Sequence, residues 1–175
     1  MTNPFNQKLF LVGMMGSGKT EVGLQFSRKY NLSFFDTDQE IEKMAGCSIT
    51  EIFANQGESE FRKMEQAVID SILTKESCII SCGGGLCIPE GMMERLKILG
   101  IVACLWAEPR TILARINKDN SRPLIDQGDP LSSIEEILQK RRNRYLAADK
   151  ILNTENKSIQ EIIQEISKFF PLNTV

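Results

Sequence analysis

The sequence predicts an α/β protein built on a parallel sheet, and three observations support this. Short apolar runs alternate along the chain with segments whose apolar residues recur at helical spacing. A glycine-rich turn stands between the first apolar run and the first helical segment, as in strand–turn–helix units. The 175 residues contain no internal repeat and no linker that would divide them, so we expect a single domain over residues 1–175.

Five strands are expected, each a short apolar run that stops at a glycine, an acid or a polar turn. They are residues 9–12, 32–35, 78–81, 101–105 and 150–153. Helices are expected over residues 19–30, around 41–45, and over 48–53, 61–73, 109–116, 133–148 and 158–169. Ser48 and Glu51 have the spacing of a capping box, and Pro109 suits the first position of its helix. Residues 117–130, rich in Pro, Gly, Asp and Asn, have the composition of a mobile loop.

Composition excludes several classes of protein. Lys and Arg total 21 against 23 Asp and Glu, which argues against a binder of nucleic acid or membrane surfaces. Histidine is absent, so Ser-His-Asp and Cys-His mechanisms and His-ligated metals are ruled out. The five cysteines form no C-x-x-C pair, and we expect them to be apolar core residues in a reducing compartment. With no signal-like or membrane-spanning segment in view, the cytoplasm is the expected location.

The strongest motif follows the first expected strand. Its sequence, Gly13-Met14-Met15-Gly16-Ser17-Gly18-Lys19-Thr20, fits G-x-x-x-x-G-K-[ST]. The glycines let backbone N–H groups turn inward at a helix start and form an anion nest. Lys19 can reach the β- and γ-phosphates, and the Thr20 hydroxyl can ligate Mg²⁺. The motif predicts a nucleoside triphosphate site, the alternative being a glycine-rich turn with a surface lysine.

A guanine-nucleotide switch is disfavoured as the owner of this phosphate loop. Such proteins normally carry D-x-x-G and N-K-x-D elements. Here no Asp stands three residues before a Gly, and Asn117-Lys118-Asp119-Asn120 places its Asp one position early. The sequence therefore favours a kinase over a switch.

Two acids, Asp36 and Asp38, follow the second expected strand. Open α/β sheets bind ligands at the carboxyl ends of their strands, and alternation along a strand sends residues two apart to the same face. We therefore expect both carboxylates to point into one crevice. One can lie near the metal and the acceptor hydroxyl while the other hydrogen-bonds the substrate. The alternative is a polar strand end that caps the next helix.

Five motifs, in this order and spacing, resemble the shikimate kinase family. They are residues 13–20, Asp36-Thr37-Asp38, Gly57-Glu58-Ser59-Glu60-Phe61-Arg62, Gly83-Gly84-Gly85 and Arg122-Pro123-Leu124. The resemblance covers about residues 9–154 and implies a P-loop three-layer sandwich of a five-stranded parallel sheet and flanking helices. It also implies a substrate-binding helical segment at about 38–66, a lid at about 117–130, and ATP-dependent phosphorylation of the 3-hydroxyl of shikimate. We expect the protein to act as a monomer.

The resemblance implies which residues bind shikimate. Arg62 and Arg141 would hold its carboxylate, Asp38 would accept from ring hydroxyls, and Gly84 would leave room for the ring. A guanidinium suits the first task because it grips a carboxylate through two parallel bonds. Each residue also has a plainer interpretation. Arg62 can pair with Glu58 and Glu65 on its own helix, and the three glycines can be a flexible strand exit.

The resemblance also implies how ATP is held. Residues 13–20 would bind the phosphates, Thr20 would ligate Mg²⁺, and Asp36 would contact the ion through water and lie near the reacting hydroxyl. Arg122 would cover the transferring phosphoryl group from the lid, and Arg115 would stack on adenine. Lys19, Asp36 and Arg122 are the expected catalytic residues. Without the match, Arg122 is a solvated loop charge and Arg115 an ordinary helix-end arginine.

One segment departs from the family pattern. Where the family carries R-x-P-L-Y, this chain has Arg141-Arg142-Asn143-Arg144-Tyr145. Spacing to Tyr145 selects Arg141 as the carboxylate ligand, with Arg142 and Arg144 as competitors. Two other functions remain open: another small-molecule kinase, such as one for gluconate, and a nucleotide-binding module without catalysis.

Overall fold

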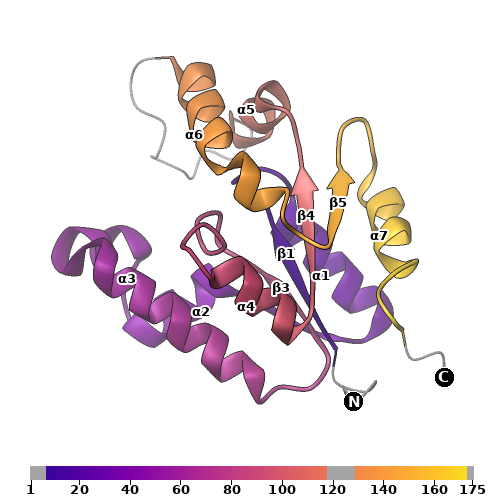
Figure 1. Ribbon diagram of the computed structural model, residues 1–175, viewed down its shortest axis with the longest axis horizontal. Helices are drawn as coiled ribbons and strands as arrows, with labels where there is room; N and C mark the ends of the chain where they lie inside the picture. Colours follow the sequence, from indigo (N-terminus) through magenta and orange to yellow (C-terminus); the bar gives the residue numbers. More distant parts are fainter. Residues whose placement is uncertain (1–6, 118–128, 173–175) are drawn as a thin grey trace.

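The computed structural model describes residues 7–117 and 129–172, which form one parallel five-stranded sheet with helices on both faces (Figure 1). The strand order is β2-β3-β1-β4-β5. The strands are β1 (Lys8–Val12), β2 (Ser33–Asp36), β3 (Cys78–Ser81), β4 (Ile101–Trp106) and β5 (Lys150–Asn153). The predicted fold, a five-stranded parallel sheet between helical layers, is confirmed.

The helices divide between the two faces of the sheet. The helices are α1 (Lys19–Tyr30), α2 (Thr37–Ala45), α3 (Ile49–Leu73), α4 (Met92–Leu99), α5 (Pro109–Asn117), α6 (Pro130–Tyr145) and α7 (Ile159–Ser167). Alternation along β1 explains the division, because Leu9 and Leu11 pack with α1 and α7 while Phe10 and Val12 pack with α3, α4, α5 and α6. A sheet buried on both faces needs continuous apolar strands, and β1 is fully buried along its length.

The strand order brings three carboxyl ends together. β3 pairs with β1 on one side and with β2 on the other, with Asp36 in register with Ser81. The phosphate loop follows β1, Asp36 ends β2 and the glycine turn follows β3, so segments from three parts of the chain meet at one edge.

Most expected elements are present, and the differences have local causes. The two expected helices at 48–53 and 61–73 form one element, α3, with a kink where Gly57 adopts φ 80° and ψ 174°. Helix α6 begins earlier than expected because Asp129 caps it and Pro130 occupies its first turn. Helix α4, of eight residues, was not predicted; its Met92 and Met93 are buried, as expected of core residues.

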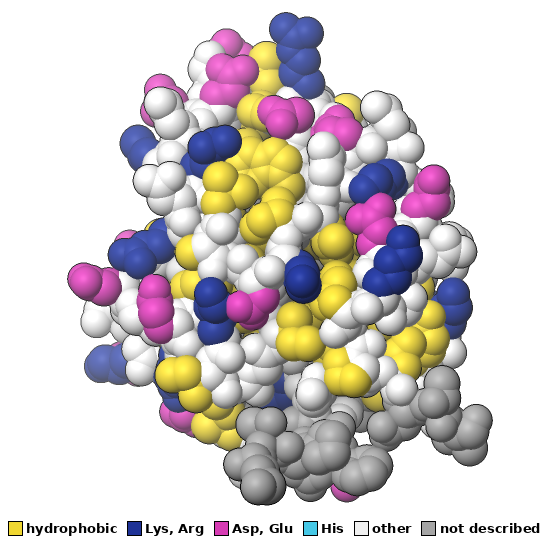
Figure 2. All heavy atoms as spheres, turned by 45° about the vertical axis from the view of Figure 1, so that its right-hand side comes forward, with side chains coloured by type: hydrophobic (Ala, Val, Ile, Leu, Met, Phe, Trp, Pro, Cys, Tyr) yellow, Lys and Arg dark blue, Asp and Glu magenta, His cyan; other side chains and the backbone are white. Residues whose placement is uncertain are grey.

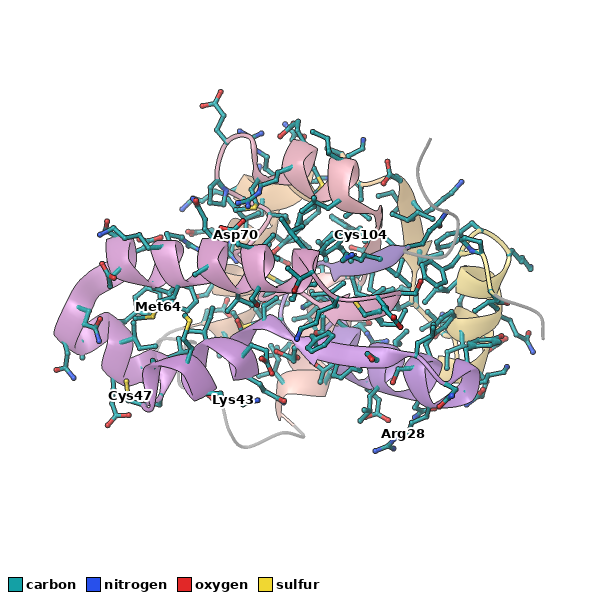
Figure 3. All side chains as sticks on the ribbon, turned by 90° about the horizontal axis from the view of Figure 1, so that it is seen from below. Arg28, Lys43, Cys47, Met64, Asp70 and Cys104 are labelled. Atoms are coloured by element: carbon teal, nitrogen blue, oxygen red, sulfur yellow. The ribbon has the colours of Figure 1, made fainter. Side chains whose placement is uncertain are left out.

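The cysteines are free thiols, and four of them are buried. Figure 3 shows Cys104 within the sheet and Cys47 beyond the end of α2. Their expected role as apolar core residues is confirmed for the buried four, Cys78, Cys82, Cys87 and Cys104.

The surface carries charges of both signs. Positive and negative side chains are interspersed over the face that carries α7 and β5 (Figure 2). Within residues 7–117 and 129–172, each helix is too short or too polar to span a bilayer.

Candidate active site

The phosphate loop joins β1 to α1 as an open nest of backbone. Gly16 and Gly18 adopt φ of 72° and 98°, which side chains disfavour, and these turns wrap the loop around the start of the helix. Gly18 is the N-cap of α1 and no side chain caps the helix, unlike α2, α3, α6 and α7. The first N–H groups of α1 are therefore available to an anion, and the helix dipole favours negative charge there.

Lys19 is not a surface lysine. Its side chain is buried, and Nζ donates to the carbonyl oxygens of Gly13 at 3.0 Å and Met14 at 2.9 Å. The ammonium therefore lies inside the loop that would hold the phosphates. Within the same loop the Ser17 hydroxyl is buried without a hydrogen-bond partner, a polar atom that a phosphate oxygen could satisfy.

Thr20, Asp36 and Ser81 bring three oxygen atoms together beside the loop. The Thr20 hydroxyl donates to Asp36 Oδ2 at 2.8 Å and lies 3.2 Å from Ser81 Oγ. The other oxygen of Asp36 accepts from the backbone N–H of Asp38 and caps α2. The capping interpretation of Asp36 is therefore confirmed, and its second carboxylate oxygen faces the Thr20 hydroxyl beside the phosphate loop. Hard divalent cations prefer all-oxygen surroundings of this kind.

Asp38 reaches the site by a route that the sequence argument did not foresee. The expected strand alternation is wrong, since β2 ends at Asp36 and Asp38 lies in the first turn of α2. Its carboxylate nevertheless lies against the glycine turn, where a side chain at Gly83 would collide with it. Thr37 fixes the approach, because its buried hydroxyl accepts from the Gly83 N–H at 2.8 Å.

Arg62 meets the same turn from α3. Its guanidinium pairs with Glu58 at 2.8 Å and with Glu65 at 2.7 Å, so the plainer interpretation is present too. These pairs also orient the guanidinium toward the glycine turn. A Cβ added at Gly85 would stand 3.2 Å from Arg62 Nη1. Burial raises the pKa of Glu65 despite the opposing hydrogen bond from Arg62. Burial works against the charged form of Arg62, but its hydrogen bonds to Glu65 and Glu58, together with their negative charges, outweigh burial and raise the pKa of Arg62.

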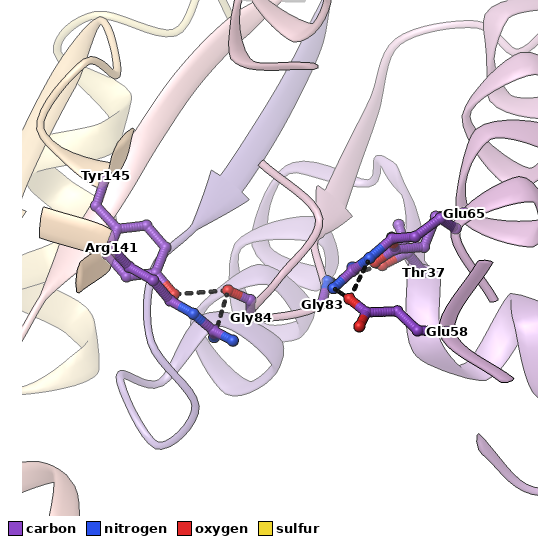
Figure 4. Close-up of polar contacts among 8 residues, drawn as sticks. Thr37, Glu58, Glu65, Gly83, Gly84, Arg141 and Tyr145 are labelled. Carbon is purple, nitrogen blue, oxygen red and sulfur yellow. Dashed lines mark hydrogen bonds and ion pairs between the residues drawn. The ribbon is translucent and has the colours of Figure 1, made fainter. Parts of the chain in front are cut away.

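Arg141 and Tyr145 contact the glycine turn from α6. Arg141 Nη1 lies 3.3 Å from the Gly84 carbonyl oxygen, and the Tyr145 hydroxyl donates to the same oxygen at 2.6 Å (Figure 4). The competing Arg142 is exposed and lies over the Trp106 ring at 5.9 Å. Of these two arginines, Arg141 is therefore the one that meets the turn.

The Gly84 position also joins the two halves of the site. A Cβ at Gly84 would stand 3.4 Å from the Met15 backbone nitrogen in the phosphate loop. The glycine turn, which Asp38, Arg62 and Arg141 contact, therefore packs against the loop that would hold the phosphates.

Arg115 lies on the opposite side of the phosphate loop. Its guanidinium donates to the Ser17 carbonyl at 3.3 Å and to the side chain and carbonyl of Thr154 at 3.1 Å each. It therefore ties the loop to the segment after β5. Arg122 and most of the expected lid at 117–130 lie outside the described residues, which end at 117 and resume at 129.

Four contacting residues were not assigned roles from the sequence: Thr37, Ser81, Tyr145 and Thr154. Thr37 and Ser81 stand beside recognised motifs at the ends of β2 and β3, so topology could have found them. Tyr145 and Thr154 act through contacts 61 and 39 residues away in the chain, which no local pattern indicates.

A phosphate loop packed against a glycine turn that an acid and two arginines contact is the arrangement of a P-loop kinase that phosphorylates a small molecule. Comparison with known proteins narrows the class. A model of the shikimate kinase family matches residues 15–171. The chain is 38% identical over 162 residues to the shikimate kinase of Thermodesulfovibrio yellowstonii, covering 93% of this chain and 94% of that one. It belongs to the shikimate kinase family.

Solved structures agree with this assignment. A shikimate kinase from Acinetobacter baumannii, solved in complex with shikimate, superposes with a TM-score of 0.84 at 31% identity, covering 92% of this chain and 90% of that one. The shikimate kinase from Bacteroides thetaiotaomicron superposes with a TM-score of 0.86 at 29% identity, covering 93% and 97%.

Proposed function

We propose that this protein transfers the γ-phosphate of ATP to the 3-hydroxyl of shikimate, with Mg²⁺. The observation that carries the proposal is the glycine turn 83–85, where Asp38, Arg62 and Arg141 converge directly beside the phosphate loop. Shikimate bears a carboxylate and three hydroxyls, so it requires cations at one end and acceptors at the other. Arg62, Arg141 and Asp38 bring both kinds of group to the glycine turn.

The acid end of the substrate is assigned to Arg62 and Arg141. They approach the turn from α3 and α6, so two guanidinium groups can hold one carboxylate between them. Glu58 and Glu65 keep the Arg62 fork in place before substrate arrives. A guanidinium that is already oriented loses less freedom on binding, which improves affinity.

The hydroxyl end is assigned to Asp38 and Asp36. Asp38 lies at Gly83 and accepts from ring hydroxyls, while Asp36, which accepts from Thr20 beside the phosphate loop, orients the reacting 3-hydroxyl. Transfer of a phosphoryl group depends more on alignment and charge neutralisation than on strong base catalysis, so a positioned carboxylate suffices.

Magnesium fits the oxygen cluster beside the phosphate loop. Thr20 Oγ1 would ligate it directly, and Asp36 and Ser81 would hold its water ligands. When bound, the ion neutralises charge on the β- and γ-phosphates. The chain's own part is to orient the Thr20 hydroxyl and to keep Asp36 fixed through its capping bond to α2.

ATP binding is assigned to residues 13–20 together with Arg115 and Arg122. Lys19 would exchange its bonds to the Gly13 and Met14 carbonyls for phosphate oxygens. Arg115 is held beside the loop by Thr154 and would meet the nucleotide base. Arg122, from the lid segment, would cover the transferring group and exclude water.

A coupled assay of ADP release tests the substrate. The purified protein is offered MgATP with shikimate, D-gluconate or nucleoside monophosphates in parallel, and product is identified by mass spectrometry. We expect turnover with shikimate and formation of its monophosphate ester. Turnover confined to gluconate or a nucleotide, or ATP binding without turnover on any acceptor, contradicts the proposal.

A further inference from the structure

Tyr145 is a buried tyrosine whose hydroxyl reaches the glycine turn at residues 83–85. It ends α6, its side chain is fully buried, and it donates to the Gly84 carbonyl oxygen at 2.6 Å. Arg141 precedes it by one helical turn, so both side chains leave the same face of α6 and meet at Gly84. Figure 4 shows Tyr145 and Arg141 on one side of the turn and Glu58 and Glu65 on the other.

The two bonds to Gly84 fix the orientation of a whole peptide group. A carbonyl oxygen has two lone pairs, and Tyr145 and Arg141 address the Gly84 oxygen together. Because a trans peptide is planar, holding this oxygen toward α6 aims the N–H of Gly85 in the opposite direction. The shorter bond, from Tyr145, is the one that remains if Arg141 leaves to bind a carboxylate.

The Tyr145 hydroxyl stays a donor over the working pH range. Burial raises the pKa of Tyr145 to about 12, with the charge of Arg141 and its hydrogen bond to the hydroxyl opposing the shift. The hydroxyl and the Arg141 guanidinium share the Gly84 carbonyl oxygen as their acceptor.

We propose that Tyr145 is a positioning residue for the acid-binding end of the site, holding the Gly84 peptide in the geometry that shikimate requires while Arg141 turns from Gly84 to the substrate carboxylate. The proposal rests on the proposed function, since it concerns how that same site recognises its substrate. Tyr145 acts through Gly84 and Arg141 and need not touch the reacting atoms.

Replacement of one hydroxyl tests this role. Tyr145→Phe keeps the packed ring and removes the donor, and we expect the KM for shikimate to rise about 3- to 10-fold, the worth of one hydrogen bond. The KM for ATP should stay within twofold. The matched control is Tyr30→Phe, on α1 in the opposite core, which should leave both KM values unchanged. An unchanged KM for shikimate in Tyr145→Phe, or an equal rise in both KM values, overturns the proposal.

A fluorine label provides a second measurement that does not require the Tyr145→Phe variant. The chain has two tyrosines, so 3-fluorotyrosine in a Tyr30→Phe protein marks Tyr145 alone. Saturating shikimate should shift its fluorine resonance, because Arg141 then turns from Gly84 to the carboxylate. D-gluconate at the same concentration should shift it less. A resonance that does not move at saturating shikimate overturns the proposal.

The two proposals fail in different ways. If the unaltered protein does not phosphorylate shikimate, the proposed function is wrong. If it does so and Tyr145→Phe has the same KM for shikimate, only the role of Tyr145 is wrong.

Discussion

Asp36 shows how one side chain can satisfy both the fold and the site. Its Oδ1 caps α2 through the Asp38 N–H, and its Oδ2 accepts from Thr20. The cap holds the carboxylate still, which is what a group that orients a hydroxyl or metal-bound water requires. The structural and functional interpretations of a polar strand end are therefore complementary at this position.

Arg62→Lys separates the shape of the guanidinium from its charge. A lysine can still neutralise Glu65 but cannot hold a carboxylate through two parallel bonds. We expect the KM for shikimate to rise about 10- to 100-fold with little change in the KM for ATP. Arg95→Lys is the control, because Arg95 pairs with Asp70 away from the glycine turn. Steady-state kinetics with each substrate varied in turn decide the outcome, and an unchanged KM for shikimate removes Arg62 from the acid site.

Glu65 should make stability depend on pH. Burial raises the pKa of this carboxyl above its ordinary value of 4.5, although Arg62 opposes the shift. A raised pKa in the folded state means that the folded protein holds its proton longer than the unfolded chain does. The associated stability is fully present below 4.5 and is lost as the pH rises through the raised pKa.

The comparison uses Glu65→Gln, which cannot titrate. Urea unfolding between pH 4 and pH 7 should show the unaltered protein losing stability relative to this variant as the pH rises. A difference between the two proteins that is constant over this range would mean that Arg62 fully compensates the burial of Glu65.

At this scale the sequence predicts what lies next to a motif and misses what meets it across the fold. Thr20 and Asp36 could be brought together because each follows a strand of one parallel sheet. Asp38 lies against the glycine turn, but the expected strand alternation was the wrong reason to bring it near Asp36, since a helix begins at Thr37. Tyr145 could not be placed at all, because its contact with Gly84 depends on how α6 docks.

Among the elements, the helices differ in how strongly their local sequence signals a start. Helices α3 and α7 begin with full capping boxes, at Ser48 with Glu51 and at Ser158 with Glu161, and the first was predicted from its spacing. Helix α4 begins after Gly91 without a side-chain cap and spans eight residues, so the sequence lacked both a start signal and a long periodic pattern.

Helix α7 packs with α1 and β1 in the core on one face of the sheet. We expect the buried apolar side chains of α7 to account for most of what this helix contributes to stability. Ile163 is 0% exposed among side chains of α1 and β1. Ile163→Ala should lower the free energy of unfolding by about 2–5 kcal/mol through lost transfer energy and a residual cavity. Ile98→Ala on α4 is the control, because Ile98 is 82% exposed and its loss should matter little. Urea titration of both variants gives the two values, and equal losses would contradict this account of α7.

For the molecule as a whole, the strand order decides where chemistry is possible. With β3 between β1 and β2, the phosphate loop, Asp36 and the glycine turn meet although they lie far apart in the sequence. The five-stranded parallel sheet was predictable from alternating patterns, whereas the order of its strands was not predicted. Strands that are far apart in the sequence pair only when helices pack on both faces of the sheet, so no single segment of the sequence indicates which strands become neighbours.

The same two-sided core places thiols where they resist ionisation. Burial raises the pKa of Cys78 and Cys87 to about 11, that of Cys104 to about 12 and that of Cys82 well above 9.0. In the unfolded chain these thiols lose protons near 9.0, so the folded state binds more protons than the unfolded state above that pH. Each raised pKa therefore contributes stability that is complete below 9.0 and is lost as the pH rises toward the folded value.

Removing one such thiol should remove one part of this alkaline loss. Cys104→Ala costs stability at neutral pH because it leaves a small cavity, but above pH 9 the gap to the unaltered protein should narrow by about 1.4 kcal/mol per pH unit. Urea unfolding under reducing conditions from pH 7.5 to 10.5 measures the gap, with Cys47→Ala, at the partly exposed end of α2, as the control. A gap for Cys104→Ala that stays constant across this range would mean that water or a nearby cation reaches the thiol inside the sheet, and that this core is less dry than its packing indicates.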